Sequence, residues 1–222
     1  MGANPSFDLV IFDCDGVLID SEQLACAADA QMLTEAGYPI TTEQVAKRFA
    51  GVPSDAMYAA IEADWGRPLP PGLRARVSDH VRALYRTELQ PIPGVADMLR
   101  GLELPKCVAS SSAPSKLALG LVETELFDLL YPHIYSVALV ERGKPHPDIF
   151  LYAAAQHGTD PGRCLVVEDS VAGVTAAKSA GMTALGFTGG SHCPPGHNET
   201  LRKAGADHVI YDIGGVLSVA SA

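Results

Sequence analysis

The chain has 222 residues, of which 47% are hydrophobic and 19% charged, and its formal net charge is -10 at pH 7. This composition is typical of a globular protein with one large or two small domains, and it excludes a disordered chain. An acidic chain without a cluster of Lys and Arg is unsuited to nucleic acid or an anionic membrane surface, so we expect neither as a partner. No apolar run approaches the roughly 18 residues of a membrane span.

The cysteines are five in number, scattered, and without a C-x-x-C pair. We therefore expect no disulfide framework and a reducing, cytoplasmic location. The N-terminus lacks a basic stretch followed by an apolar one, so no signal peptide is expected. We expect a small-molecule substrate and a monomer or weak dimer.

Residues 7–22 contain the strongest local pattern in the chain. The apolar run at residues 9–12 is typical of a buried parallel strand, and it leads into Asp13, Asp15 and the turn residue Gly16. Ligands of open α/β sheets bind outside the carboxyl ends of strands, and two acids held together favour a divalent cation. The alternative is a strand followed by a solvated Asp-Gly turn.

The chain after this strand is predicted to be helical as far as residue 89. Helices are expected over residues 21–36, 42–49, 55–65 and 72–89, with a break at residues 50–53. The Pro- and Gly-rich residues 91–94 indicate a boundary. We therefore predict an all-helical cap over residues 19–89, inserted into a core of residues 1–18 and 90–222.

Helices and strands alternate in the rest of the chain. Strands are expected at residues 106–110, 133–137, 164–167, 182–187 and 207–211, and helices at residues 95–102, 115–122, 147–157, 171–180 and 214–220. This order predicts an α/β fold, a Rossmann-like parallel sheet flanked by helices and joined by right-handed crossovers.

Polar residues follow several of these strands. Asp13 and Asp15 follow the first, Ser110 with Ser111 ends the second, and Glu168 with Asp169 follows the strand at 164–167. A Gly/Pro loop presents Lys144 before the next helix. Carboxylates from two strand ends suit Mg²⁺, while serine, helix N-termini and a lysine suit a phosphate. Taken singly, the serine would be interpreted as a helix cap and the lysine as a solvated side chain. Together they predict phosphoryl chemistry.

Four motifs in this order resemble those of the haloacid dehalogenase superfamily over essentially the whole chain. They are D-C-D-G-V-L-I-D-S-E at residues 13–22, S-S-S at 110–112, G-K-P-H-P-D-I-F at 143–150 and V-V-E-D-S-V-A-G-V-T-A-A-K-S-A-G-M at 166–182. The helical block resembles the cap of the subgroup that contains β-phosphoglucomutase and many sugar-phosphate phosphatases.

The resemblance implies a role for each matched residue. Asp13 would be the nucleophile that forms an aspartyl-phosphate, and Asp15 the general acid/base, which also lends its carbonyl to Mg²⁺. Ser110 and Lys144 would hold the phosphoryl group, with Ser111 beside them. Asp169 would bind Mg²⁺ directly and Glu168 would assist through water. An aspartate at position 15 favours phosphate esters over carbon–halogen bonds and phosphonates.

The resemblance leaves a phosphatase and a phosphomutase as alternatives. β-Phosphoglucomutase-like caps carry an arginine after the glycine of a loop that resembles residues 50–54, where this chain has no cation. We therefore favour a Mg²⁺-dependent phosphatase of a sugar phosphate or sugar-acid phosphate. Lys47 and Arg48, just before that loop, are candidate substrate-binding residues, with a solvated helix end as the alternative.

Two further interpretations remain at the level of sequence. A non-enzymatic phospho-aspartate receiver domain would also place aspartates and a lysine at a parallel sheet, but it would carry no helical insert after the first strand. Residues 189–197 hold His192, Cys193 and His197 and would permit a zinc site. Their Gly and Pro content favours a surface loop.

Overall fold

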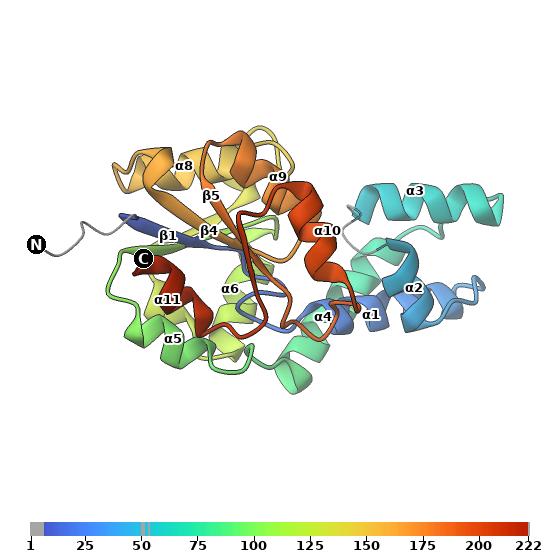
Figure 1. Cartoon of the computed structure of the whole chain (residues 1–222). Coiled ribbons are helices and arrows are strands. Elements are labelled where there is room, and N and C mark those ends of the chain that lie inside the picture. The colour runs from blue at the N-terminus through green and yellow to red at the C-terminus, as the bar shows by residue number, and fades with distance from the viewer. Residues whose placement is uncertain (1–6, 50–51, 53, 222) are drawn as a thin grey trace, which may run out of the picture. The chain divides into compact units, whose positions relative to one another are not determined.

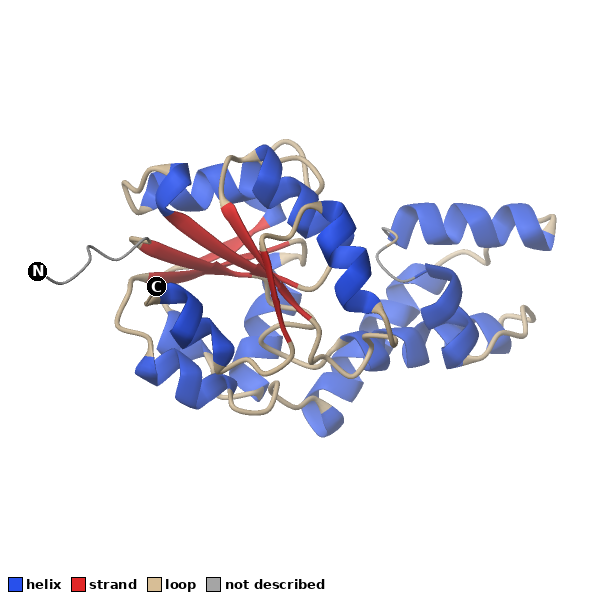
Figure 2. Cartoon of the chain, viewed as in Figure 1, coloured by secondary structure: helices blue, strands red, loops and turns tan. Residues whose placement is uncertain are grey.

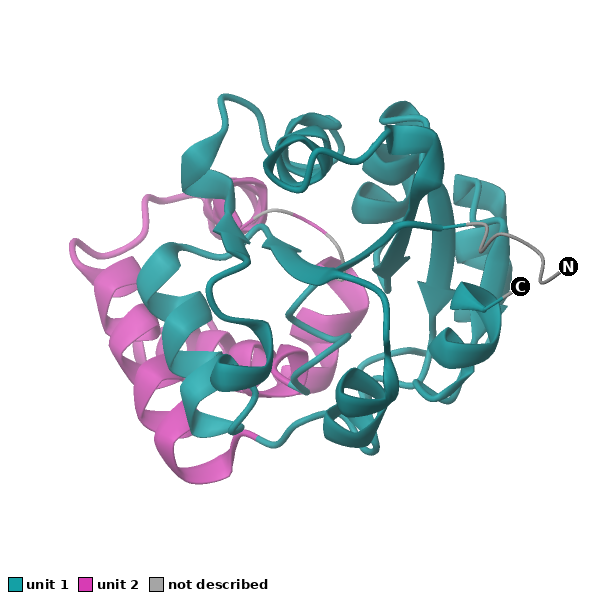
Figure 3. Ribbon diagram, turned by 90° about the vertical axis from the view of Figure 1, so that its left-hand side faces the viewer, with its two compact units in different colours: residues 1–20, 90–222 teal, residues 21–89 magenta. Residues whose placement is uncertain are grey.

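The computed structural model describes residues 7–49, 52 and 54–221. The chain divides into two compact units, one formed by residues 1–20 and 90–222 and the other by residues 21–89 (Figure 3). The break expected at residues 50–53 lies, apart from Val52, outside the described residues.

The first unit contains a parallel sheet with the strand order β3-β2-β1-β4-β5-β6 across the described residues. Figure 1 labels its strands β1, β4 and β5. Its strands pair in parallel at every junction, which confirms the predicted α/β class. The strands are β1 (Leu9–Phe12), β2 (Lys106–Ser110), β3 (Ile134–Ser136), β4 (Cys164–Glu168), β5 (Thr183–Phe187) and β6 (His208–Ile210).

Helices cover both faces of this sheet (Figures 1 and 2). The helices of the first unit are α5 (Val95–Gly101), α6 (Pro114–Glu123), α7 (Phe127–Leu130), α8 (Asp148–Gln156), α9 (Val171–Ser179), α10 (His197–Ala204) and α11 (Gly215–Ala220), with short 3-10 turns η1 (Val137–Leu139) and η2 (Pro161–Arg163). Because both faces are covered, the central strand β1 is apolar throughout, and all four of its residues are buried.

The strand order reverses direction at β1, where β2 lies on one side and β4 on the other. In open α/β sheets this switch point, at the carboxyl ends of the strands, is where ligands bind. The register pairs Phe12 of β1 with Val108 of β2 and with Val167 of β4. The residues that follow these three positions therefore emerge at one edge of the sheet.

The second unit is helical over its described residues, with α1 (Glu22–Glu35), α2 (Thr42–Phe49), α3 (Ser54–Trp65) and α4 (Leu73–Glu88). Helix α1 packs against α2 and α4. The fully buried side chains of this unit include Leu33, Ile61 and Leu73. No helix in the described part of the chain has both the length and the apolar character that crossing a membrane requires.

Some predicted boundaries differ from the observed ones. Ile19 and Asp20, assigned to the cap from the sequence, belong to the first unit, because the Asp20 amide donates to the Gln90 carbonyl and Ile19 bridges to Pro91. Helices α7 and α10 were not predicted. Both are short, with Leu130 and Leu201 as their buried residues, so neither carries an apolar periodicity.

Candidate active site

Acidic side chains converge where β1 and β4 end. Asp13 follows β1 directly, and its amide donates to the carbonyl of Val167 over 3.0 Å. Glu168 is the last residue of β4, and Asp169 comes next. Carboxylate oxygens of Asp13, Glu168 and Asp169 lie within 4.8 Å of one another, and all three residues are buried. The register of the two strands thus builds an oxygen-rich cluster of the kind that a hard divalent cation prefers.

Lys144 inserts its ammonium group into this cluster. Its Nζ lies 2.5 Å from Asp13 Oδ1 and 2.6 Å from Glu168 Oε1, and it donates to the carbonyl of Ala109 over 3.0 Å. The side chain is 5% exposed. Burial by itself lowers the pKa of Lys144, but the two carboxylates raise it above its usual value. The amine is therefore held as a cation, in position to neutralise charge on a bound anion.

Asp13 is in an environment that does not stabilise its negative charge fully. Burial raises the pKa of Asp13 well above its usual value; Lys144 lowers it, while Glu168 and Asp169 raise it again. The three carboxylates of Asp13, Glu168 and Asp169 outnumber the two cationic side chains that contact them, Lys144 and His192. A divalent cation would offset the remaining negative charge, so the donor set and its charge fit a metal ion.

Glu168 is held in place from several directions. Its Oε1 accepts from Lys144, and its Oε2 accepts from the amide and hydroxyl of Ser170 at 3.0 and 2.9 Å. A Cβ on Gly173 would fall 1.8 Å from the Glu168 carboxyl carbon. The small residue in α9 is therefore required for the carboxylate to fit. Because its oxygens are occupied in this way, Glu168 orients Lys144 as well as contributing to the acidic cluster.

Asp15 points toward a different set of partners. Its Oδ2 accepts from Ser112 Oγ over 2.5 Å, and its Oδ1 lies 3.0 Å from Lys116 Nζ. Gly16 follows with φ +82, the left-handed conformation that glycine favours. Asp15 is thus placed two residues from Asp13 but is bound by side chains of the α6 region. This separation suits a proton-transfer group beside a nucleophile.

The serines after β2 have different environments. Ser110 is buried, and its Oγ accepts from the amide of Ser112 over 3.0 Å. Ser111 is exposed. Ser112 and Lys116 are the residues that sequence reasoning missed. The available signal was their position at the start of the helix after β2, where backbone N–H groups and side chains face the strand ends.

Residues 189–197 contact Asp169 of the acidic cluster, whereas their Gly and Pro content predicts a surface loop. His192 Nε2 lies 2.8 Å from Asp169 Oδ2, and His197 Nε2 lies 2.6 Å from the carbonyl oxygen of Asp169. Burial by itself lowers the pKa of His192, but the contacts with Asp169 and Cys193 raise it to about 11. Among the described residues, the group of side chains placed to hold a metal ion is the acidic one, and His192, Cys193 and His197 do not belong to it.

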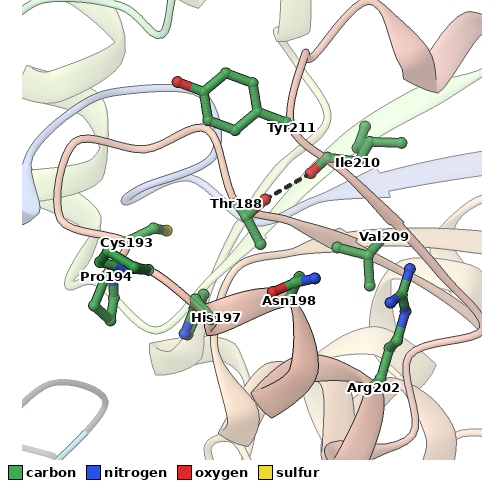
Figure 4. A pocket seen from close by; sticks show the side chains of 11 residues that line it. Thr188, Cys193, Pro194, His197, Asn198, Arg202, Val209, Ile210 and Tyr211 are labelled. Carbon is green, nitrogen blue, oxygen red and sulfur yellow. Dashed lines mark hydrogen bonds between the residues drawn. The ribbon is translucent and has the colours of Figure 1, made fainter.

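A surface pocket of about 470 Å³ adjoins this loop (Figure 4). Residues 193–198 and 209–211 line it, together with Thr188 and Arg202. Thr188 Oγ1 donates to the carbonyl of Ile210 over 3.1 Å and ties the ends of β5 and β6 together. The acids of the cluster do not line this pocket, although His197, which does, contacts the Asp169 carbonyl.

The cap candidates Lys47 and Arg48 are both exposed and occupy the last turn of α2. The Arg48 guanidinium donates to the hydroxyl of Tyr38 over 2.9 Å and to Asp64 over 3.3 Å. Arg48 is therefore engaged with its own unit, whereas Lys47 extends from the same turn as an exposed cation.

The fold and the cluster at its switch point define a class of hydrolase. The model of the haloacid dehalogenase-like hydrolase family matches residues 10–187, and the chain belongs to this family. The chain is 30% identical over 189 residues to the 6-phosphogluconate phosphatase of Escherichia coli (strain K12), with 85% of this chain and 86% of that protein covered.

Solved structures give the same result. A haloacid dehalogenase-like protein of unknown function from Agrobacterium tumefaciens str. C58 is 41% identical, with a TM-score of 0.87 and with 96% of this chain and 97% of that chain covered. A hydrolase of the family from Deinococcus radiodurans R1, with bound phosphate and sodium, is 32% identical, with a TM-score of 0.78 and coverage of 96% and 94%. The phosphatases among the relatives support the predicted class, a phosphoric monoester hydrolase.

Proposed function

We propose that this protein is a Mg²⁺-dependent phosphatase that hydrolyses a small phosphorylated sugar or sugar acid through an aspartyl-phosphate on Asp13. The observation that carries the proposal is the buried cluster of Asp13, Glu168 and Asp169 around the ammonium of Lys144. Few structural roles would justify so many buried ionised groups, whereas a phosphoryl group and a cation would use each of them.

The proposed reaction has two steps at phosphorus. In the first, a carboxylate oxygen of Asp13 forms a bond to phosphorus while the bond to the leaving oxygen breaks and Asp15 gives that oxygen a proton. In the second, Asp15 takes a proton from a water molecule while the water oxygen attacks phosphorus. The bond between phosphorus and Asp13 then breaks and phosphate is released. Nucleophilic and acid–base work are thus divided between two aspartates.

Lys144 and Ser110 would bind the phosphoryl oxygens in both steps. Lys144 already contacts Asp13, so the same cation can neutralise the nucleophile and the transferring group. A Mg²⁺ ion held by Asp13, Asp169 and the carbonyl of Asp15, with Glu168 behind them, would supply further charge stabilisation for the phosphoryl group. The bound phosphate of the Deinococcus radiodurans relative supports a phosphate site in this family.

The substrate class rests on relatives rather than on the cluster. The 6-phosphogluconate phosphatase acts on a phosphorylated sugar acid, which makes such compounds the first to test. Lys47 is exposed in the second unit and is the better candidate there for an anionic substrate group, because Arg48 is already bonded to Asp64. We infer that residues 21–89 act as a substrate-selecting cap.

The test is a phosphate-release screen over phosphorylated sugars and sugar acids, with Mg²⁺ or with EDTA. Asp13→Asn keeps the shape of the side chain but removes the nucleophile, so we expect turnover to fall by at least about a thousandfold. Asp97→Asn is the matched control, since Asp97 is exposed and pairs with Arg100.

Several outcomes would contradict the proposal. Retained turnover in the Asp13→Asn variant would contradict the assignment of Asp13 as the nucleophile. Full activity in EDTA would contradict the requirement for a metal ion. An isomerised sugar phosphate without free phosphate would establish a phosphomutase instead.

A further inference from the structure

The loop at residues 189–197 contacts the turn after β1 as well as the residue after β4. The amide and hydroxyl of Ser191 both donate to Asp20 Oδ1, over 3.2 and 2.8 Å. The next residue, His192, reaches Asp169 Oδ2 over 2.8 Å. His197, at the start of α10, reaches the Asp169 carbonyl over 2.6 Å. Asp169 is therefore held by this loop at its side chain and at its backbone.

The imidazole of His192 occupies a slot between two glycines. A Cβ on Gly16 would lie 2.8 Å from His192 Cε1, and a Cβ on Gly190 would lie 2.7 Å from the same atom. The Gly16 Cβ would also fall 2.1 Å from Asp169 Oδ2. A Cβ on Gly16 would therefore collide with both partners of the contact between His192 and Asp169, whereas a Cβ on Gly190 would collide with the ring.

The hydrogen bonding of the ring also points to this contact. A carboxylate only accepts, so His192 Nε2 is the donor to Asp169. The same nitrogen lies 3.5 Å from Cys193 Sγ. The other ring nitrogen, Nδ1, is buried and has no hydrogen-bond partner in the described part of the structure. A buried nitrogen without a hydrogen-bond partner is costly, and the hydrogen bond to Asp169 offsets this cost.

We propose that His192 is a positioning residue of the metal centre, whose Nε2–H fixes the carboxylate of Asp169 in the orientation that faces Asp13 and Glu168. The inference rests on the metal-binding part of the proposed function. A ligating carboxylate whose outer oxygen is held by a donor loses less freedom when the ion binds. Such outer partners change metal affinity without touching the metal.

The test is calorimetric titration of Mg²⁺ into the full chain without substrate. In His192→Ala and His192→Asn the side chain at position 192 no longer donates to Asp169 Oδ2, and we expect the dissociation constant to rise by about 10- to 100-fold. In His192→Gln the amide nitrogen occupies the place of Nε2, and we expect affinity within about threefold of the parent. His208→Ala, at an exposed histidine of β6, is the control and should bind as the parent does.

The variants separate the inference from its alternatives. Parent-like Mg²⁺ affinity in both His192→Ala and His192→Asn would overturn it, even if the phosphatase screen succeeds. Equal weakening in His192→Gln and His192→Ala would also overturn it, because packing rather than the hydrogen bond would then matter. If the pattern of affinities is as expected and the screen finds no phosphatase activity, the positioning role stands and the proposed reaction fails. Circular dichroism in EDTA identifies any variant that fails to fold.

Discussion

Lys144 is the residue on which the charge balance of the site depends most directly. Its ammonium group lies between Asp13 and Glu168, and these side chains are 5%, 10% and 1% exposed in that order. Phe150 of α8 places its ring centroid 4.9 Å from the same nitrogen, which adds a favourable cation–π contact. An isolated carboxylate in such surroundings would be strongly disfavoured, so the amine stabilises the fold as well as preparing it for an anion.

Lys144→Met is expected to lower the free energy of unfolding by about 3 kcal/mol in EDTA, because it leaves buried carboxylates without their partner. Adding Mg²⁺ should restore part of this loss, since a cation replaces the missing charge. Urea denaturation with and without the metal measures both effects. Lys178→Met, which breaks a pair more than a third exposed, should cost under about 1 kcal/mol. Equal stability of Lys144→Met and the parent in EDTA would contradict this account.

The sequence predicted the residues that parallel strands bring together. Asp13, Glu168 and Asp169 follow strands whose ends must meet at one edge, and Lys144 comes from a loop that returns to the same edge. Ser112 and Lys116 were missed, and the contact of His192 with Asp169 was not predicted. A lysine in a helix is usually solvated, and the path of a Gly/Pro-rich loop depends on tertiary contacts such as that of Ser191 with Asp20. No local pattern records such contacts.

At the scale of the element, helix α10 illustrates what periodicity does not detect. Its residues are mostly polar, and Leu201 is its buried side chain. A Cβ on Gly186 of β5 would lie 3.0 Å from Leu201 Cδ1, so the helix depends on a glycine in the strand beneath it. Strand β4, with five buried residues, was by contrast predicted to within one residue. The missed element is one whose stability comes from tertiary packing.

Asp207 joins elements α9, β5 and β6. Its carboxylate lies 2.8 and 2.7 Å from Lys178 Nζ and accepts from the Ala184 amide over 2.8 Å. Burial by itself raises the pKa of Asp207, but the bonds from Lys178 and Ala184 lower it below its usual value. A depressed folded-state pKa means that this carboxylate stabilises the fold above its unfolded pKa of about 3.9. That contribution is lost as the pH falls through the folded value.

Asp207→Asn is therefore expected to cost about 1 kcal/mol at pH 7, a value discounted for the exposure of both partners. The difference should shrink below about pH 4 and vanish when the parent carboxyl is protonated, because the parent then resembles the amide. Urea midpoints of both proteins from neutral to acid pH provide the measurement. Asp97→Asn, at an exposed position, should follow the parent throughout. A difference that persists at low pH would assign the effect to shape rather than charge.

At the scale of the whole molecule, the two units divide the chemistry from the helical insert. Asp13, Glu168 and Asp169 all belong to the first unit, which also contains the sheet. The second unit has its own buried residues, among them Leu33, Ile61 and Tyr85. Each unit thus has a core from which its stability can arise, and ligands of one need not stabilise the other.

Mg²⁺ is accordingly expected to slow hydrogen exchange in strands β1 and β4 more than in helices α1–α4. At a concentration of 100 times the dissociation constant, binding stabilises the unit that holds the ion by about 2.7 kcal/mol, or roughly a hundredfold in exchange through global opening. Ile61→Ala should affect the second unit and not the first. It truncates a fully buried side chain of α3 and should lower the free energy of unfolding of the second unit by about 3 kcal/mol. Exchange should then accelerate in α1–α4 while Mg²⁺ affinity stays within about twofold of the parent value. Equal protection of all helices and strands by Mg²⁺ would mean that the units open together, and the metal would then stabilise the chain as one cooperative body.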